Sequence, residues 1–384
     1  MQNFEFWNPV KILFGKGQIG RLRVEVPRDA RVLLTYGGGS IKRNGVYEQV
    51  ITALEDRVVF EFGGIEPNPT YETLMRAVEV VKREGIDFLL AVGGGSTLDG
   101  TKFIAAAAKF AGEPWDILAK GARVEDAIPL GAVLTLPATG SEMNAFAVVS
   151  RRATHEKLAF STPKVYPKFS IVDPETTFSL PPRQVANGVV DAFAHVLEQY
   201  LTFPSSAPLQ DRYAESILLT LIEEGPKTLA DPTDYHARAN LCWCATMALN
   251  GLIALGVPQD WTTHTIGHEL TAFHGLDHGQ SLAVVFPGTM AARRAGKRAK
   301  LLQYAERVWS IREGGEDARI DQAIARTREF FESLGVKTRL KDYGVPPETV
   351  KKISARFAER GWNGMGERQD VGPKQVEEIL AHSL

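Results

Sequence analysis

Short apolar runs that end at glycine or proline recur through the first 180 or so residues, and they constrain the fold more than any other feature of the sequence. Stretches with helical periodicity separate the runs, as at residues 71–85 and 97–111. The runs lie at residues 31–36, 88–92, 131–136 and 169–172. Buried parallel strands have this pattern because helices cover both faces of their sheet. Strands that alternate with helices therefore predict an α/β domain with a parallel sheet.

The pattern changes after the double proline at Pro181 and Pro182. Long helical periodicities follow, and few strand candidates remain. These periodicities lie at residues 185–202, 209–224, 237–252 and 316–334. Two domains are the ordinary expectation for 384 residues. We expect an α/β domain over residues 1–182 and an all-helical domain over residues 183–384.

Composition narrows the classes of function. A net charge of −2 without a basic stripe argues against nucleic acid as a partner. No apolar run reaches the roughly 18 residues that a membrane span requires, and the N-terminus lacks the pattern of a signal peptide. The two cysteines, Cys242 and Cys244, lie in a helical segment at a spacing that does not let them face each other. Buried small hydrophobic side chains are favoured over a redox pair, and a reducing, cytoplasmic setting fits.

A glycine-rich turn, Gly93-Gly94-Gly95-Ser96, follows the second apolar run. Glycine lets the backbone approach an anion closely, and a helix beginning near Ser96 or Thr97 adds partial positive charge. We therefore expect the pyrophosphate of a dinucleotide at this turn, which is neither a GxGxxG fingerprint nor a P-loop. A tight strand-to-helix turn without a ligand is the alternative.

A similar turn follows the first run, at a place where an acidic residue usually binds the ribose 2′-hydroxyl of NAD. The turn consists of Gly37, Gly38, Gly39 and Ser40. Residues 36–44 hold no Asp or Glu, and Lys42 and Arg43 follow the turn instead. A hydroxyl and two cations suit a 2′-phosphate, so NADP(H) is favoured over NAD(H). The alternative is that both cations are only solvated.

Hydroxyl side chains gather where the third run ends, in the segment Thr-Leu-Pro-Ala-Thr-Gly-Ser-Glu at residues 135–142. Such strand ends line the crevice where ligands bind in open α/β sheets. Thr135 and Thr139 are candidates for contact with the nicotinamide half of the cofactor. A capped helix start at Thr139 or Ser141 is an equally open explanation.

Metal-ligating side chains cluster in the second half of the chain. Asp191 and His195 are four residues apart in an apolar segment, so on a helix they share a face. A carboxylate on an apolar face is costly to bury unless it is paired or bound to a metal. Four of the eight histidines fall between residues 263 and 279, namely His264, His268, His274 and His278. One carboxylate with imidazoles suits Zn²⁺ or Fe²⁺. His264 and His278 flank a segment that bends at Gly275, so these two could converge, but spacing alone does not choose the two further ligands.

These motifs together resemble the iron-containing (group III) alcohol dehydrogenases. The matching segments are residues 11–15 (KILFG), the GGGSxxDxxK pattern at 93–102, TxPxTGSE at 135–142, Asp191-x3-His195, His264-x3-His268 and His278-Gly279. Residues 36–40, 187–200 and 268–278 are similar to the butanol-dehydrogenase-like branch, which includes NADPH-dependent aldehyde reductases of broad substrate range.

The resemblance implies a role for each matching residue. The implied metal ligands are Asp191, His195, His264 and His278, and the implied pyrophosphate contacts are Gly94, Gly95 and Ser96. Further implied cofactor contacts are Asp99, Thr135, Thr139 and Lys157. His268 and His274 are placed beside the metal as candidates for proton transfer. The implied fold is a Rossmann-like dinucleotide-binding domain and a helical metal domain with the active site in the cleft between them, in a homodimer or larger homo-oligomer.

One position departs from the resemblance, because many members carry proline before the last histidine ligand and this chain has Asp277. The expected activity is hydride transfer between NADP(H), with NAD(H) possible, and a short- to medium-chain alcohol or aldehyde, dependent on one Fe²⁺ or Zn²⁺ ion. The alternatives are a polyol (glycerol-type) dehydrogenase, a dehydroquinate-synthase-like lyase, a metallohydrolase whose glycine turns bind a substrate phosphate, and a non-enzymatic nucleotide-binding protein.

Overall fold

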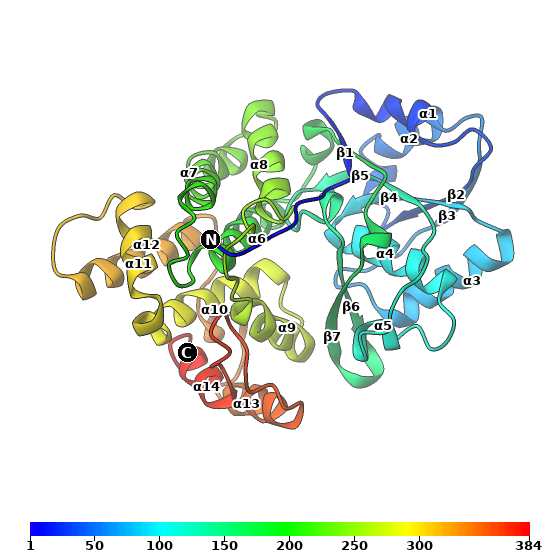
Figure 1. The fold of residues 1–384 in the computed structure, drawn as a ribbon. Coiled ribbons are helices and arrows are strands. Elements are labelled where there is room, and N and C mark those ends of the chain that lie inside the picture. The colour runs from blue at the N-terminus through cyan, green and yellow to red at the C-terminus, as the bar shows by residue number, and fades with distance from the viewer. The chain divides into compact units, whose positions relative to one another are not determined.

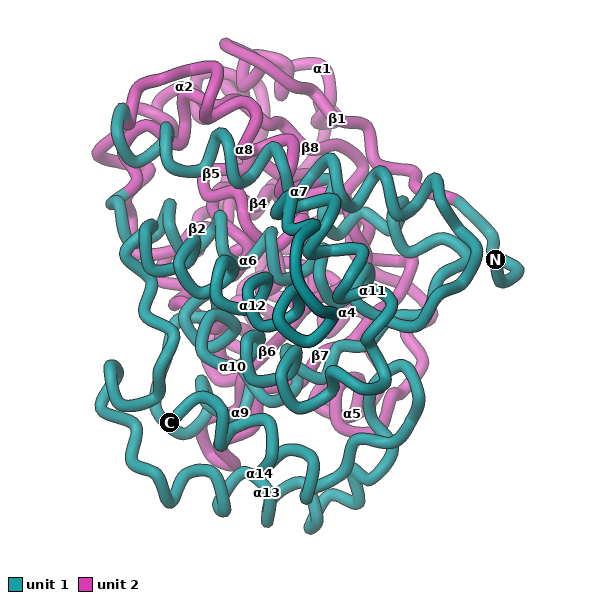
Figure 2. The backbone as a smooth tube through the Cα atoms, turned by 90° about the vertical axis from the view of Figure 1, so that its left-hand side faces the viewer, with its two compact units in different colours: residues 1–6, 181–231, 247–384 teal, residues 7–180, 232–246 magenta.

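The computed structural model describes residues 1–384, which group into two compact units. Unit 1 comprises Met1–Phe6, Pro181–Asp231 and Met247–Leu384 (Figure 2). Unit 2 comprises Trp7–Leu180 and Pro232–Thr246. Each unit therefore draws on more than one stretch of the chain, whereas the expected division at residue 182 describes two continuous domains.

Unit 2 is built on a six-stranded parallel sheet with the strand order β1-β8-β5-β4-β2-β3 (Figure 1). The strands are β1 (Lys11–Phe14), β2 (Arg31–Tyr36), β3 (Val58–Phe62), β4 (Phe88–Gly94), β5 (Leu130–Leu136) and β8 (Phe169–Val172). The four predicted strands are β2, β4, β5 and β8, the four in the centre of the sheet. The parallel α/β architecture is thus confirmed. The apolar runs do not reveal the edge strands β1 and β3.

Helices cover both faces of the sheet because successive strand residues point to opposite sides. Leu33 packs with Leu74 and Phe103 on one face, while its neighbour Leu34 packs with Val50 on the other. The covering helices are α2 (Val46–Ala53), α3 (Tyr71–Glu84) and α4 (Gly95–Lys109), with the short α1 (Leu22–Glu25) and α5 (Asp116–Ala119) at the margins. An antiparallel hairpin of β6 (Phe146–Arg151) and β7 (Glu156–Ser161) completes the strands, and no part of it was predicted.

The helix α8 (Tyr235–Ala248) belongs mostly to unit 2, although it lies far beyond Pro182 in the sequence. Cys242 packs against Leu134 and Val172, and the Thr246 hydroxyl donates to Glu142 over 2.6 Å. These contacts explain why the chain returns to the sheet here. Both cysteines are buried free thiols, as expected of small hydrophobic side chains.

Unit 1 is helical, which confirms the expectation for the second half of the chain. Its helices are α6 (Pro182–Tyr200), α7 (Pro208–Ala230), α9 (Thr262–His274), α10 (His278–Ala292), α11 (Arg294–Arg307), α12 (Glu316–Ser333), α13 (Thr349–Glu359) and α14 (Pro373–Ala381). A core cluster joins Leu270 of α9, Val284 of α10, Phe357 of α13 and Ile379 of α14. None of the helices combines the length and hydrophobicity that crossing a lipid bilayer requires.

Candidate metal centre and dinucleotide site

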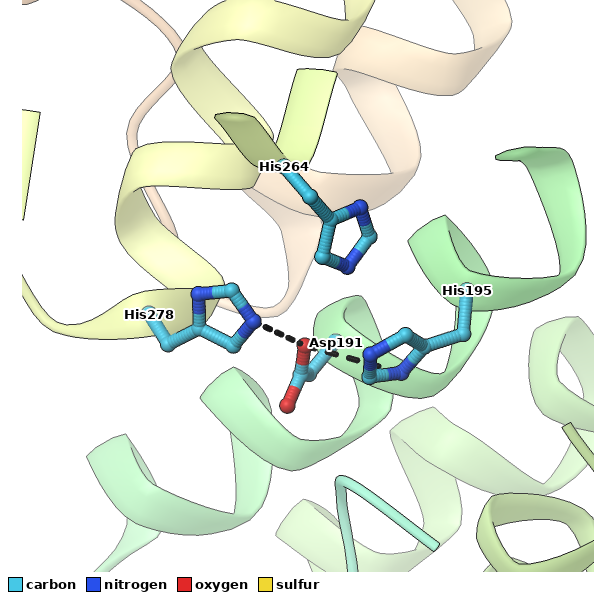
Figure 3. A group of neighbouring side chains, drawn as sticks. All are labelled: Asp191, His195, His264 and His278. Atoms are coloured by element: carbon cyan, nitrogen blue, oxygen red, sulfur yellow. Dashed lines mark ion pairs between the residues drawn. The ribbon is translucent and has the colours of Figure 1, made fainter. Parts of the chain in front are cut away.

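Helix α6 supplies the first two side chains of the candidate metal centre. Asp191 and His195 are four residues apart, so they lie on one face of the helix, and each side chain is 4% exposed. The Asp191 Oδ1 atom lies 3.7 Å from His195 Nδ1 and 3.4 Å from Nε2 of His278 (Figure 3). A carboxylate buried among imidazoles is the arrangement that a bound cation would stabilise.

The other two side chains of the candidate metal centre come from α9 and α10, on either side of the junction between these helices. His264 lies in the first turn of α9, and His278 is the first residue of α10. Gly275 ends α9 in the left-handed conformation, with a φ of 71°, so the chain reverses before α10 begins. The ring centroids of His195 and His264 are 4.7 Å apart, and those of His264 and His278 are 5.2 Å apart.

The four side chains point toward one another (Figure 3), and one ligand atom from each lies within 4.8 Å of the others. The set offers one carboxylate oxygen and three imidazole nitrogens. This chemistry fits a borderline divalent ion such as Fe²⁺ or Zn²⁺, whose ligand bonds to nitrogen and oxygen are about 2.0–2.2 Å long. The structure therefore brings together the four residues that the resemblance named as ligands.

A second carboxylate beside this group was not identified from the sequence. Glu198, on α6, is 1% exposed and accepts a hydrogen bond at its Oε1 atom from the backbone N–H of His264 over 3.0 Å. The same oxygen lies 3.0 Å from His264 Nδ1. Burial and then the nearby charge of Asp260 raise the pKa of Glu198 well above its usual value. The sequence feature that could have indicated this contact is the position of Glu198, three residues after the predicted ligand His195.

Asp277, the departure noted in the sequence, connects α10 to α6. It is the N-cap of α10 and forms a capping box with Gln280. Its Oδ2 atom accepts a hydrogen bond from Asn187 over 2.8 Å and lies 3.1 Å from Nη1 of Arg183. Next to His278, a Cβ atom on Gly279 would lie 2.5 Å from the backbone oxygen of Asn187. The two helices that carry ligands thus meet closely at this point.

The two histidines expected to transfer protons lie outside the four-residue group. His268 is half-buried, and its ring centroid is 5.6 Å from that of His278. His274 is exposed at the end of α9, and its Nε2 atom lies 2.9 Å from Oγ1 of Thr349. Burial and then the charge of Lys352 lower the pKa of His274. Their roles stay predictions, and His268 is the nearer of the two to a ligand by ring contact.

The second glycine turn joins β4 directly to α4, in unit 2. Packing requires its glycines, since a Cβ atom on Gly94 would lie 2.8 Å from Cβ of Leu136, and one on Gly95 would lie 2.5 Å from Oγ1 of Thr139. The helix begins at Gly95, one or two residues before the expected start near Ser96 or Thr97. The turn therefore presents backbone N–H groups at a helix N-terminus beside Thr139, as a phosphate-binding turn does.

Several predicted cofactor contacts also hold the loops around this turn. Ser96 Oγ accepts from the backbone of Asn68 over 3.2 Å, and Lys157 Nζ donates to the Asn68 side chain over 2.9 Å. Asp99 is half-buried, and its carboxylate accepts from the Ser141 hydroxyl over 2.7 Å and the Val148 backbone over 2.9 Å. Burial raises the pKa of Asp99.

Lys102, the last residue of the GGGSxxDxxK pattern, was given no role from the sequence. Its side chain is fully buried, and Nζ donates to Ser141, to Asn144 and to the backbone oxygen of Phe146 over 2.8–3.0 Å. Burial lowers the pKa of this amine to about 8. Lys102 therefore connects α4 to the segment that follows β5. Thr135, a predicted cofactor contact, is 8% exposed and lies near the end of β5.

The first glycine turn has an acidic neighbour that the sequence did not reveal. Glu61 comes from the adjacent strand β3, and its Oε2 atom lies 2.7 Å from Nζ of Lys42 and 2.9 Å from the Tyr36 hydroxyl. The hydrogen bond to Glu61 raises the pKa of Lys42. Lys42 is thus an ion-paired side chain at the turn. Arg43 is exposed and donates to the backbone oxygen of Gly39 over 3.4 Å.

Comparison with known proteins places both halves of the chain in one family. Residues 9–174 match the family model of iron-containing alcohol dehydrogenase, and residues 185–384 match the C-terminal model of the Fe-containing alcohol dehydrogenase family. The chain is 59% identical over 374 residues to the NADPH-dependent aldehyde reductase YqhD of Escherichia coli, covering 97% of each. It is 43% identical over 389 residues to the probable NADH-dependent butanol dehydrogenase 1 of Bacillus subtilis, covering 100% of each.

Solved structures that are similar to this chain are of the same kinds of enzyme. The crystal structure of E. coli YqhD has a TM-score of 0.98 at 57% identity, covering 100% of this chain and 99% of the other. The NADH-dependent butanol dehydrogenase A of Thermotoga maritima has a TM-score of 0.95 at 37% identity, with the same coverage. The four clustered metal-ligating side chains, the glycine turns and these likenesses agree with one another, and the chain belongs to the iron-containing alcohol dehydrogenase family.

Proposed function

We propose that this protein is a metal-dependent alcohol dehydrogenase or aldehyde reductase, which transfers hydride between NADP(H) and a short- to medium-chain alcohol or aldehyde. The observation that carries the proposal is the convergence of Asp191, His195, His264 and His278, whose ligand atoms lie within 4.8 Å of one another. In the reductive direction, hydride adds to the carbonyl carbon, a proton is taken up by the oxygen, and NADP⁺ and an alcohol result.

The proposed metal ligands are these four residues, and Fe²⁺ or Zn²⁺ is the proposed ion. When bound, the ion supplies Lewis-acid polarisation of the carbonyl, while the nicotinamide supplies the hydride. The chain's own contribution is to hold the ligand atoms in fixed positions on three packed helices. His268 and His274 are the proposed groups for proton movement, through a direct contact or a water molecule.

The proposed dinucleotide contacts lie in unit 2. Gly94, Gly95 and Ser96 would hold the pyrophosphate at the start of α4, supported by the close fit of these glycines. Asp99, Thr135, Thr139 and Lys157 are proposed for the nicotinamide half. Gly37, Gly38, Gly39 and Ser40 are proposed for the adenosine ribose.

NADP(H) is the favoured cofactor. Lys42 at the first turn supplies a positive charge for a 2′-phosphate, and the 59% identical relative bears an NADPH-dependent name. Glu61 is a competing partner for Lys42, and the B. subtilis relative bears an NADH-dependent name, so both cofactors belong in the test.

Two broader proposals accompany this function. A cytoplasmic location suits the two free cysteines, which a reducing compartment would keep as thiols. A homodimer or larger homo-oligomer is proposed from the family resemblance.

The test is an assay of NADPH and NADH oxidation across short aldehydes, run on metal-free protein and on protein refilled with Fe²⁺ or Zn²⁺. We expect NADPH to be consumed only by the refilled enzyme, and faster than NADH. No consumption with any aldehyde would contradict the proposal and favour the metallohydrolase alternative. A faster rate with NADH would overturn the cofactor preference alone.

A further inference from the structure

Glu198 makes three hydrogen-bonding contacts with the start of α9. Its Oε1 atom meets both the backbone N–H and Nδ1 of His264 over 3.0 Å, and Oε2 accepts from the backbone N–H of Trp261 over 3.2 Å. The carboxylate is 1% exposed, so water does not compete for it. One buried side chain therefore holds both the backbone and the ring of a single clustered histidine.

The direction of these bonds fixes the form of the histidine. A carboxylate oxygen only accepts, and Oε1 already accepts from the backbone of His264. The charge of Lys297 and the backbone N–H groups of His264 and Trp261 favour the ionised form of Glu198, and with that form Nδ1 carries the hydrogen, which leaves the lone pair of a neutral imidazole on Nε2. Metal-bound histidines commonly donate their other ring nitrogen to a carboxylate in this way.

A buried lysine is bonded to Asp260, the residue whose backbone meets that of Glu198. Lys297 is 3% exposed, pairs with Asp260 over 2.7 Å and with Glu367 over 2.9 Å, and donates to the backbone oxygen of Leu201 over 2.6 Å. The backbone of Asp260 in turn donates to the backbone oxygen of Glu198 over 2.9 Å. Glu198 is thus anchored at both its main chain and its carboxylate, so its position does not depend on solvent.

We propose that Glu198 is a positioning residue of the metal centre, which orients His264 so that Nε2 faces the ion and Nδ1 does not. The inference rests on the proposed function, because it needs a metal to be bound by the four clustered residues. It adds a residue that acts through His264 and does not itself touch the ion. Loss of such a carboxylate partner typically weakens metal binding by about 10–100-fold.

The direct test is the Zn²⁺ affinity of Glu198→Gln, measured by competition with a chromophoric chelator. An amide offers one acceptor oxygen and a donating NH₂ group, so it cannot accept from all three N–H groups that meet the carboxylate. We expect affinity to fall by about 10–100-fold. The matched control is Glu215→Gln, a 7% exposed glutamate in the same unit that bonds Tyr200 and Gln303, and its affinity should stay within about twofold of wild type.

A double-mutant cycle separates positioning from a purely structural role in starting α9. If Glu198 acts through His264, then Glu198→Gln should change Zn²⁺ affinity by less than about twofold when His264→Ala is already present. An equal loss in both backgrounds would overturn the proposal. The visible spectrum of Co²⁺-loaded protein should change in Glu198→Gln and not in Glu215→Gln.

A measurement on the wild type needs no variant to fold. The nitrogen NMR signals of His264 in Zn²⁺-loaded protein should show a protonated Nδ1 and a metal-bound Nε2, and metal on Nδ1 would overturn the proposal. Failure of the wild type to bind Zn²⁺ would overturn the proposed function as well. Tight wild-type binding with an unchanged Glu198→Gln would overturn only the role of Glu198.

Discussion

At the scale of single residues, polar side chains within an apolar helical segment gave the strongest indication of the metal centre. Asp191 and His195 could be paired from their spacing on an apolar helix, and the structure places them together at 4% exposure. The same reasoning could not choose among four histidines between residues 263 and 279. A bend at Gly275 could be predicted, but its geometry and the capping of α10 by Asp277, which set where His278 lies, are not encoded in helical periodicity.

Asp191→Ala tests the proposed ligands most directly. Asp191 is the one carboxylate of the cluster, and its Oδ1 atom lies within 3.7 Å of two histidine rings. Removing it leaves three neutral ligands for a doubly charged ion, so we expect bound metal and aldehyde reduction to fall by at least about 100-fold. Metal content per chain and turnover with NADPH measure this.

The control for Asp191→Ala is cofactor affinity. The proposed dinucleotide residues all lie in unit 2, so titration of the variant with NADPH should give a dissociation constant within about twofold of wild type. A variant that kept its metal and full turnover would show that Asp191 is not a ligand.

At the scale of elements, burial decided which strands could be predicted. The central strands are enclosed on both faces, so they read as unbroken apolar runs, as in β4, whose first six residues are all buried. The edge strand β3 has only exposed and half-buried positions and carries Glu61, so its run is broken. Glu61 then reaches the first glycine turn from the neighbouring strand, a contact that a search along residues 36–44 could not find.

Gly279→Ala tests the meeting of α6 and α10. The added Cβ atom would lie 2.5 Å from the backbone oxygen and 2.9 Å from Cα of Asn187. A flexible side chain could relieve such a clash by changing its rotamer, but these backbone atoms cannot. Overpacking of this kind costs about 1–3 kcal/mol. We expect a lower midpoint of thermal unfolding and weaker Zn²⁺ binding, because His278 would move away from Asp191.

Gly315→Ala is the matched control for that substitution. A Cβ atom there meets no other atom within 4 Å, and the backbone at the start of α12 has a φ of −67° that any residue adopts. Its unfolding midpoint and Zn²⁺ affinity should match the wild type. A Gly279→Ala variant with unchanged Zn²⁺ affinity would show that the close contact does not set the position of His278.

At the scale of the whole molecule, the sequence pattern separates a sheet unit from a helical unit, and α8, which follows the double proline in the chain, groups mostly with the sheet unit. The double proline marks where the chain leaves the sheet, whereas a single proline, Pro232, stands at its return and reads as an ordinary turn between two helices. Helix α8 packs Cys242 against Leu134 and Val172 through apolar side chains that would serve equally in a helical bundle. Long-range packing of this kind has no local signature, because its partners lie more than 65 residues away in the chain.

This division predicts that the two ligands protect different amides from hydrogen exchange. The four proposed metal ligands all lie in unit 1, and the proposed dinucleotide contacts all lie in unit 2. A ligand at 100 times its dissociation constant stabilises the state that binds it by about 2.7 kcal/mol. Zn²⁺ alone should therefore slow exchange in α6, α9 and the start of α10, while NADPH alone should slow it at residues 36–42 and 93–102. In Asp191→Ala the protection by Zn²⁺ should vanish and the protection by NADPH should remain. Zn²⁺ protection confined to the glycine turns would contradict the assignment of the metal to unit 1.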